Sequence, residues 1–398
     1  MRIYYSVVDA FPAYRVDLAE LFGVELSKLG LQTDWFMRSG EAVQIGQAHS
    51  YAGQRVRLAP ALRGWPGPIR RLAYWLADAW GLIAQWRNPP DALQCRDKFL
   101  TSVLALWIAR LLRRPFFYWC SYPFPEHAAL MAERASGPKR TLLHLKAKLQ
   151  HWLLYRYICP RAAHVFVQSE QMKQDMADYG VPPANMTAVP MGVPAALGAS
   201  VLPAETKVKA NRFIYLGSLG RIRRLETLID AFALVSSALP DAELLFVGDG
   251  DVPSERPALE AYAARLGLEN SVRFTGFLPM QDAWALAATA HVCVSPVYPD
   301  RAMRAASPTK LIEYMALGRP VVCNDHPEQS QVIADSGAGV CVPWSAEAFA
   351  AAMIRLATDS ELAARCAKLG PAWVRANRSY PIIAKQVWTV YQRLLNAV

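Results

Sequence analysis

The stretch Ser307–Val322 constrains the fold of this chain more than any other, because a polar turn, a short helix, a glycine and a buried strand follow one another directly. We expect Ser307 to cap the helix and Pro308 to lie in its first turn. Gly318 ends the helix, and the apolar residues after it begin the strand. Chemistry at such a helix is expected at its N-terminus.

The first residues of this helix suit an anionic ligand. The free N–H groups of Thr309 and Lys310 would point outward with the positive end of the helix dipole, which favours phosphate. Lys310 adds a charge, and Glu313, about one turn further on, can accept hydrogen bonds from a sugar diol such as ribose. The alternative is an ordinary amphipathic helix on which Lys310 and Glu313 are solvated.

The order of predicted elements indicates an α/β fold with two domains. A chain of 398 residues is about twice the usual size of one domain. Strand and helix patterns alternate up to about residue 190 and again from Arg212, as in parallel sheets covered by helices. We expect domains over 1–200 and 201–379, a terminal helix over 380–398, and a linker of small and polar residues at Pro194–Val208.

The seven cysteines and seven histidines favour neither disulfides nor a metal site. The cysteines are widely spaced and include no Cys-x-x-Cys pair, which indicates reduced thiols in a cytosolic protein. The histidines are dispersed, so we expect no metal. The N-terminus reads as a first strand and not as a signal peptide, and no apolar segment has the length needed to span a bilayer.

The net charge of +10 is concentrated in the first half of the chain. Residues 1–200 carry 23 Lys and Arg against 14 Asp and Glu, whereas residues 201–398 carry 20 against 19. The predicted helix Lys139–Arg161 is basic and amphipathic, and the region Gly53–Arg87 mixes arginine with tryptophan and proline. Both patterns suit an anionic membrane surface. The alternatives are a helix packed on its own domain and a surface loop before a core helix.

Four motifs of the second half occur in an order that carries a family resemblance. They are Gly217-Ser218-Leu219, Val247-Gly248-Asp249-Gly250, Phe274-Thr275-Gly276-Phe277 and the stretch Ser307–Val322. This order resembles the group 1 glycosyltransferases of the GT-B fold. The resemblance implies two Rossmann-like domains that face each other across a cleft, and a C-terminal helix that crosses back to the first domain. It also implies a UDP- or GDP-sugar donor, transfer with retention, and no metal.

The resemblance assigns donor-binding roles to residues of the second domain. The family usually has an arginine and a lysine after the first strand of this domain. In this chain Ser218 replaces the arginine, and Arg223 stands at the position of the lysine. The contact with the diphosphate would therefore come from Arg221 or Arg223. The backbone at Phe277 would pair with the nucleobase, and the alternative for its side chain is a place in the core. The implied donor site comprises Gly217, Ser218, Arg221, Arg223, Phe277, Ser307, Thr309, Lys310 and Glu313.

One family glutamate is missing, because its place is taken by Ala305. Its usual contact with the donor sugar is therefore lost or supplied by another group, for example Arg301 or Arg304 if the sugar is acidic. This hypothesis predicts faster turnover of UDP-glucuronate than of UDP-glucose. A preference for glucose would rule it out.

The candidate catalytic residues of the first domain follow predicted strands, where open α/β sheets bind ligands. The loop Asp9–Arg15 follows the first strand, and Ser121 follows the strand Pro115–Cys120. Ser121 occupies the place of a frequent active-site histidine in the family. Glu126 and His127 are the nearby polar groups best placed to contact the transferred sugar or the acceptor, and a structural role is the alternative for each.

The predicted function is sugar transfer to a lipid-linked glycan acceptor in exopolysaccharide or envelope polysaccharide synthesis. We expect a cytoplasmic enzyme bound peripherally to the anionic inner face of the cell membrane, with no nucleic acid as partner. One rival is a nucleotide-sugar epimerase of the same fold, which product analysis with UDP-sugar alone would reveal. The other is a basic nucleic-acid-binding protein, which would show salt-dependent RNA or DNA binding.

Overall fold

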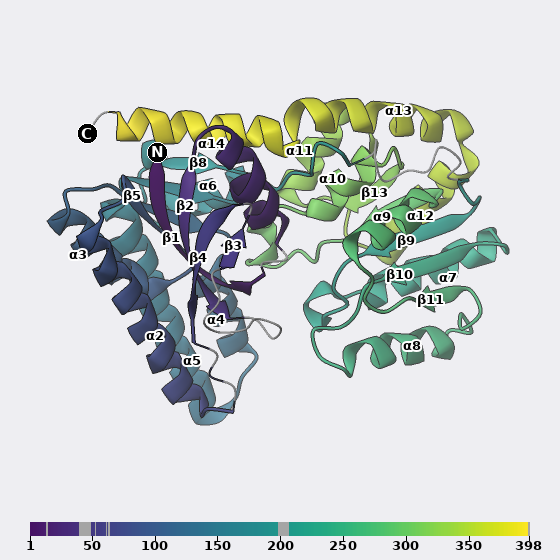
Figure 1. Ribbon diagram of the computed structural model, residues 1–398. Helices are drawn as coiled ribbons and strands as arrows, with labels where there is room; N and C mark the ends of the chain where they lie inside the picture. The colour runs from purple at the N-terminus through teal and green to yellow at the C-terminus, as the bar shows by residue number, and fades with distance from the viewer. Residues whose placement is uncertain are drawn as a thin grey trace. The chain divides into compact units, whose positions relative to one another are not determined.

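The chain forms two compact units. The structure, a computed structural model, describes residues 1–12, 15–39, 49–51, 53–60, 62, 64–197 and 207–396. The first unit consists of Met1–Pro190 together with Tyr380–Val398, and the second of Met191–Ser379. Each unit is a parallel sheet flanked by helices (Figure 1). The predicted α/β class is confirmed.

The first unit is built on an eight-stranded sheet in the order β3-β4-β2-β1-β5-β6-β7-β8, parallel except for the β3–β4 pair. Its strands are β1 (Arg2–Phe11), β2 (Gln32–Ser39), β3 (His49–Tyr51), β4 (Gln54–Ala59), β5 (Ala92–Arg96), β6 (Phe116–Cys120), β7 (His164–Val167) and β8 (Met186–Ala188). Its helical segments are η1 (Asp17–Glu25), α1 (Leu26–Lys28), α2 (Gly67–Ile83), η2 (Ala84–Arg87), α3 (Phe99–Leu111), α4 (Phe124–Glu133), α5 (Gly137–His151), η3 (Trp152–Ile158), η4 (Cys159–Arg161), α6 (Glu170–Asp178), η5 (Pro183–Asn185) and α14 (Tyr380–Leu395).

Helices cover both faces of this sheet. The β1-η1-β2 and β5-α3-β6 connections run in opposite directions along the sheet, so right-handed crossovers place η1 and α3 on opposite faces. The C-terminal helix α14 packs against η1, and its apolar side chains, such as Val387 and Tyr391, join the core beneath the sheet. The Tyr391 hydroxyl donates a 2.5 Å hydrogen bond to Gln94 Oε1 on β5. The last helix is therefore an integral part of the first unit.

A buried ion pair explains the charge that interrupts the apolar pattern of α2. Asp78 lies on the buried side of the helix and accepts hydrogen bonds from Lys98 Nζ at 2.6 Å and from Thr101 Oγ1 at 2.9 Å. Burial lowers the pKa of Lys98, and Asp78 partly offsets this effect. Removing either partner would leave a buried charge unpaired, which is strongly destabilising.

The second unit is built on a six-stranded parallel sheet in the order β11-β10-β9-β12-β13-β14. Its strands are β9 (Arg212–Leu216), β10 (Glu243–Val247), β11 (Val272–Phe274), β12 (Val292–Ser295), β13 (Val321–Asn324) and β14 (Gly339–Val342). Its helical segments are η6 (Arg221–Arg223), α7 (Glu226–Ala238), α8 (Glu255–Arg265), α9 (Met280–Ala288), η7 (Met303–Ala305), α10 (Thr309–Ala316), α11 (Pro327–Ser336), α12 (Ala346–Thr358) and α13 (Ser360–Asn377).

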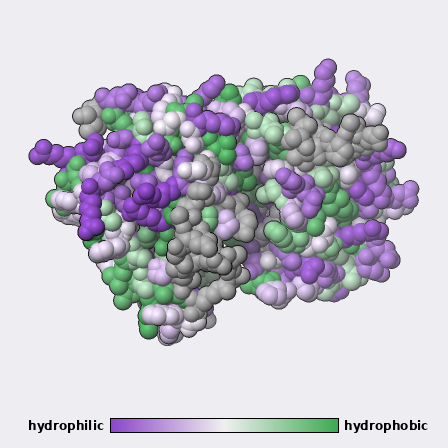
Figure 2. Space-filling model, viewed as in Figure 1, coloured by the Kyte–Doolittle hydropathy of each residue, from purple (hydrophilic) through white to green (hydrophobic). Residues whose placement is uncertain are grey.

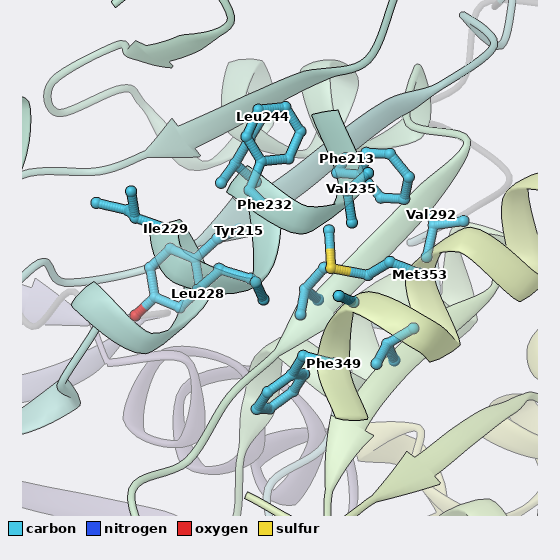
Figure 3. Packing of buried hydrophobic residues seen from close by; sticks show 14 of the residues in the cluster. Phe213, Tyr215, Leu228, Ile229, Phe232, Val235, Leu244, Val292, Phe349 and Met353 are labelled. Atoms are coloured by element: carbon cyan, nitrogen blue, oxygen red, sulfur yellow. The ribbon is translucent and has the colours of Figure 1, made fainter. Parts of the chain in front are cut away.

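The core on one side of this sheet joins strands β9, β10 and β12 to helices α7 and α12 (Figure 3). Tyr215 of β9 lies at its margin, with its ring in the cluster and its hydroxyl pointing away from the labelled apolar side chains. That hydroxyl donates a 2.8 Å hydrogen bond to the carbonyl of Ser218 in the following loop. Core packing thereby fixes the loop that leaves the carboxyl end of β9.

The structure differs from the sequence-based expectations mainly in the first unit. Strand β4 lies within the region Gly53–Arg87, whose first part was expected to be a loop, and β3 lies just before this region, where no strand was predicted. Strand β1 continues through Asp9 to Phe11, so the expected loop begins later. Of the two interpretations of Gly53–Arg87, the alternative of a core helix does not hold for α2, because only Asp78, Gly81 and Leu82 of this helix are buried. Parts of the predicted loop, linker and C-terminal helix lie outside the described residues, at Ala13, Tyr14, Arg63, 198–206 and 397–398.

Candidate functional site

The candidate donor site lies where the strand order of the second sheet reverses. Strands β10 and β11 extend the sheet on one side of β9, and β12, β13 and β14 extend it on the other. Open α/β sheets bind ligands outside the carboxyl ends of their strands at such a switch point. The loop after β9 and the segment from β12 to α10 both start at this edge. The predicted donor residues 217–223 and 307–313 belong to these two segments.

Two glycines let the strand-end loops approach one another closely. Gly217 has φ of 142° and Gly248 has φ of 140°, a region that strains any residue with a side chain. A Cβ at Gly248 would collide with the carbonyl oxygen of Gly217, and a Cβ at Gly217 would lie 3.2 Å from Lys310 Nζ. Glycine is therefore required at both positions, and it leaves room for Lys310 beside the loop.

Lys310 and Arg223 form a positively charged pair at this edge. The Lys310 ammonium lies 4.0 Å from the centroid of the Tyr215 ring. Burial lowers the pKa of Lys310 well below its usual value, the nearby Arg223 lowers it further, and Glu313 partly offsets both effects. Arg223 Nε is buried and has no hydrogen-bond partner among the described residues. Two adjacent cations with an unused donor favour a bound anion.

Glu313 lies on the same helix, one turn beyond Lys310, and is 4% exposed. Burial raises the pKa of its carboxyl group to about 7, and the nearby Trp284 indole and Lys310 partly offset this effect. The indole N–H faces the carboxylate without a well-aligned hydrogen bond. The carboxylate oxygens therefore keep capacity to accept hydrogen bonds from a ligand. The alternative that Lys310 and Glu313 are merely solvated is wrong.

Ser307 does not cap the helix, which corrects the sequence-based expectation. Helix α10 begins at Thr309 with Pro308 at the capping position, and no side chain of the described residues caps it. Ser307 Oγ instead donates to Glu328 Oε1 at 2.5 Å and accepts a hydrogen bond from the N–H of Met191 at 2.8 Å. The hydroxyl is used to fix the segment before the helix. The N–H groups of the first turn, including that of Thr309, retain the donor capacity of a helix N-terminus.

Ser218 and Arg221 are tied into the loop after β9. Ser218 Oγ donates to Asp251 Oδ1 at 2.8 Å and accepts from the N–H of Gly220 at 3.1 Å. The backbone N–H of Arg221 donates to Glu255 Oε1 at 2.9 Å, while its side chain is exposed. Of the two arginines considered for the diphosphate, Arg223 is the one whose charge reaches Lys310.

Phe277 has an exposed side chain, so the alternative that it belongs to the core is wrong. It is 80% exposed and follows Gly276, whose carbonyl accepts a hydrogen bond from the N–H of Gly248 at 3.2 Å. Its backbone thus lies next to the strand-end loops, where the resemblance places the nucleobase. An exposed aromatic ring here is available to a ligand.

The first unit has a buried polar cluster at its own switch point, between β1 and β5. Arg96, at the end of β5, is fully buried, and its Nη2 lies 2.8 Å from Asp17 Oδ2. Its Nε lies 3.6 Å from Asp97 Oδ2 and 3.8 Å from Asp9 Oδ2. Burial opposes the charge of Arg96, but these carboxylates raise its pKa. Burial alone would raise the pKa of Asp17, yet Arg96 holds it below its usual value.

Ser121 is held by this cluster. Its N–H donates a 2.9 Å hydrogen bond to Asp97 Oδ1, and its hydroxyl donates to Asp97 Oδ2. Burial raises the pKa of Asp97 despite these hydrogen bonds and Arg96. The sequence reasoning missed Arg96 and Asp97. Three consecutive charged residues, Arg96 to Lys98, directly after a buried strand were the signal that could have revealed them.

Glu126 and His127 have partners different from that of Ser121. The Tyr155 hydroxyl lies 2.9 Å from both carboxylate oxygens of Glu126, whose pKa is raised by burial. His127 Nδ1 lies 2.9 Å from the Tyr122 hydroxyl. Each of the three candidates is thus fixed by a separate neighbour, and their catalytic roles stay predictions.

Neither a metal cluster nor a bilayer-spanning helix occurs in the part of the chain that the structure describes. Within the described residues, no group of three or more His, Cys, Asp or Glu side chains is arranged to hold a metal ion. In the same part of the chain, no helix combines the length and apolarity needed to cross a bilayer.

Both the fold and the donor-side geometry are typical of nucleotide-binding α/β proteins. Residues 210–359 match the family described as glycosyl transferases group 1, and residues 20–192 match the glycosyl transferase 4-like domain. Together these two regions span most of the chain and correspond to its two sheets. The chain therefore belongs to the group 1 glycosyltransferases and has the GT-B fold.

Individual relatives are distant. A phosphatidyl-myo-inositol mannosyltransferase of Mycobacterium leprae is 29% identical over 181 residues, which are 45% of this chain and 46% of that protein. The chain thus spans about half the length of the curated relatives it matches. Among solved structures, sucrose-phosphate synthase from Thermosynechococcus elongatus is 19% identical with a TM-score of 0.74, and both chains are covered completely. Anabaena Alr3699/HepE in complex with UDP and glucose is 18% identical with a TM-score of 0.71, covering 99% of this chain and all of that one.

Proposed function

We propose that the protein transfers a sugar from a nucleotide diphosphate donor to a glycan acceptor. The observation that carries this proposal is the pair Lys310 and Arg223 at the N-terminus of α10, next to the buried carboxylate of Glu313. The two cations and the helix amides would hold the diphosphate. Glu313 would accept hydrogen bonds from the ribose hydroxyls. A UDP-sugar is the first donor to test, because the similar Anabaena structure contains UDP; a GDP-sugar is the alternative.

The same groups would stabilise the leaving group during transfer. Negative charge develops on the diphosphate as the bond to the sugar breaks, and Lys310, Arg223 and the helix dipole are positioned to stabilise it. We propose transfer with retention, in which the leaving diphosphate assists the acceptor hydroxyl. These protein cations supply the charge stabilisation, so we propose that no metal is needed.

The acceptor is proposed to be a lipid-linked glycan in exopolysaccharide or envelope polysaccharide synthesis. The Mycobacterium leprae relative is named a phosphatidyl-myo-inositol mannosyltransferase. A solved structure with the same fold, WaaG, is described as a glycosyltransferase involved in lipopolysaccharide biosynthesis. The basic first half of the chain favours an anionic surface near the acceptor. We propose that the enzyme is cytoplasmic and peripheral on the inner face of the cell membrane.

Changing Lys310 to methionine tests the donor site. The Lys310→Met variant should bind UDP about 10- to 100-fold more weakly, because a charge-assisted contact to the diphosphate is lost. Isothermal titration calorimetry would measure this change.

The matched control is Lys368→Met, which removes an exposed lysine from α13 and should leave UDP affinity unchanged. Arg223→Met provides a second test of the same site and should also weaken binding. Unchanged UDP affinity in both the Lys310 and Arg223 variants would refute the proposed donor site.

A further inference from the structure

Helix α2 presents an apolar stripe to solvent. Ile69, Leu72, Leu76, Trp80 and Ile83 recur every three or four residues and are each at least half exposed, with Trp80 reaching 74%. This spacing places them on one side of the helix. Scattered exposed apolar residues are normal on a protein surface, but a continuous stripe of this kind marks an interaction site.

Helix α5 and its continuation η3 carry a second stripe. Leu142, Leu145, Leu149 and Trp152 have helical spacing and are exposed, with Leu142 at 68%. Ala147 is the only buried residue of α5. Helix α5 packs against α4, as the alternative of a helix packed on its own domain expects, but its leucines are exposed. The helix is held at the surface with its leucines in solvent.

Helix α3 connects these two stripes. It packs against α2 on one side and against η3 on the other, and it adds the exposed residues Leu100, Trp107 and Leu111. We call the exposed apolar residues of α2, α3, α5 and η3 together the apolar face. Figure 2 shows apolar surface along the lower left edge of the first unit, where Figure 1 places α2 and α5. The apolar face is thus a feature of one unit and involves several helices.

The exposed charges of α2, α3, α5 and η3 have one sign, although the neighbouring α4 carries the exposed Glu133. Asp78 is the only acidic residue in these four segments, all of which the structure describes, and it is buried against Lys98. The basic residues of the same segments are mostly exposed: Arg70, Arg71, Arg110, Lys139, Arg140, Lys146, Lys148 and Arg156. Apolar and aromatic side chains bordered by Lys and Arg are the composition of a surface that lies in the interface of an anionic bilayer.

We propose that the apolar face inserts into the interfacial region of an anionic lipid bilayer, with the tryptophans and leucines of α2, α3 and α5 below the headgroups. This inference rests on the peripheral membrane binding in the proposed function. It adds that three helices make the contact and that the contact is chiefly hydrophobic. The basic residues would contact lipid headgroups at its border. A second copy of the chain could also cover an apolar face, but its own face would bring the same positive charge, which disfavours that pairing.

The test is flotation with vesicles of phosphatidylcholine containing about 30% phosphatidylglycerol. Wild-type protein should float with these vesicles and remain largely bound in about 0.5 M NaCl, since screening removes electrostatic attraction but not apolar insertion. The double variant Leu142→Asp/Leu145→Asp should lower the lipid partition coefficient by about tenfold for each leucine replaced. Trp80→Asp should weaken binding as well, which tests α2 independently of α5.

The control variant is Leu234→Asp, which places the same charge at an exposed leucine on α7 of the second unit and should not change flotation. Circular dichroism and thermal melting of every variant report correct folding, and UDP affinity, which depends on the second unit, separates this inference from the donor assignment. Quenching of the wild-type tryptophan fluorescence by brominated lipid provides a test that needs no substitution.

Three results would overturn the proposal. The first is equal flotation of the face variants and the Leu234 control. The second is complete release by salt with no quenching by brominated lipid, which would indicate adsorption by charge alone. The third is a dimer, measured by light scattering, that is lost in Trp80→Asp while flotation is unchanged.

Discussion

Replacing Glu313 by glutamine should make the free protein more stable at about pH 8 while weakening its binding of a nucleotide sugar. Burial raises the pKa of Glu313 from 4.5 to about 7. Ionising this carboxyl in the folded protein is therefore unfavourable, by about 3 kcal/mol at pH values above 7. Glutamine keeps the shape of the side chain and carries no charge, so the variant avoids this cost.

The sign of the pH dependence distinguishes this explanation from a general packing effect. Between pH 4.5 and 7 the folded wild-type protein holds a proton that the unfolded chain has lost, so wild-type stability falls as pH rises through this range. The gain from Glu313→Gln should be full at about pH 8 and nearly absent at about pH 4.5. Melting temperatures measured across this range check the prediction.

The affinity of Glu313→Gln for UDP should fall, although the stability of the variant rises. A charged acceptor for the ribose hydroxyls is lost, so UDP should bind about 10- to 100-fold more weakly at about pH 8. The exposed Glu269→Gln serves as the control and should change neither quantity. A stability gain of the same size at every pH would contradict the account of Glu313.

Replacing Arg96 by methionine should destabilise the first unit by about 3–5 kcal/mol at neutral pH. The variant removes a buried cation that lies close to three carboxylates, those of Asp9, Asp17 and Asp97. Breaking a buried ion pair by removing one partner leaves charge that is neither paired nor hydrated. Chemical denaturation of the full chain would measure the loss.

Acidification should reduce this loss. In the wild-type protein the pKa of Asp17 is lowered, so its stabilising interaction is present above the unfolded value of 3.8 and fades as pH falls. The variant lacks the Arg96 part of this interaction, so the two proteins should approach each other in stability as the pH falls below about 3.8. Arg273→Met, at an exposed position on β11, is the control. A loss that does not depend on pH would argue against the ion-pair explanation.

The second unit could be predicted closely from sequence because its determinants are local. Gly217 and Gly248 end buried strands, and Lys310 and Glu313 occupy neighbouring turns of one helix, so spacing alone brought them to one edge of the sheet. Ser307 shows the limit of local reasoning. Its hydroxyl bonds to Glu328 and to the N–H of Met191, and no pattern around Ser307 indicates these distant partners.

The first unit was predicted less well because its site depends on contacts between distant segments. Arg96 gains its role from Asp9 and Asp17, which precede it by about 80 residues of sequence. The exposure of α2 also could not be read from its composition, since an apolar helix pattern fits a core as well as a membrane surface. Burial in the folded structure separates these two interpretations.

The position of α14 has a consequence for the order of folding during synthesis. The first unit is made of two pieces of chain, and the second piece, Tyr380–Val398, leaves the ribosome only after the whole second unit. Its buried residues Tyr380, Ile383, Val387 and Tyr391 complete the core beneath β1 and β5. The second unit is continuous in sequence and can finish folding once its own residues have emerged. The domain that is translated first is therefore completed last, and a ribosome that stops before residue 380 releases a chain whose first unit has an open core.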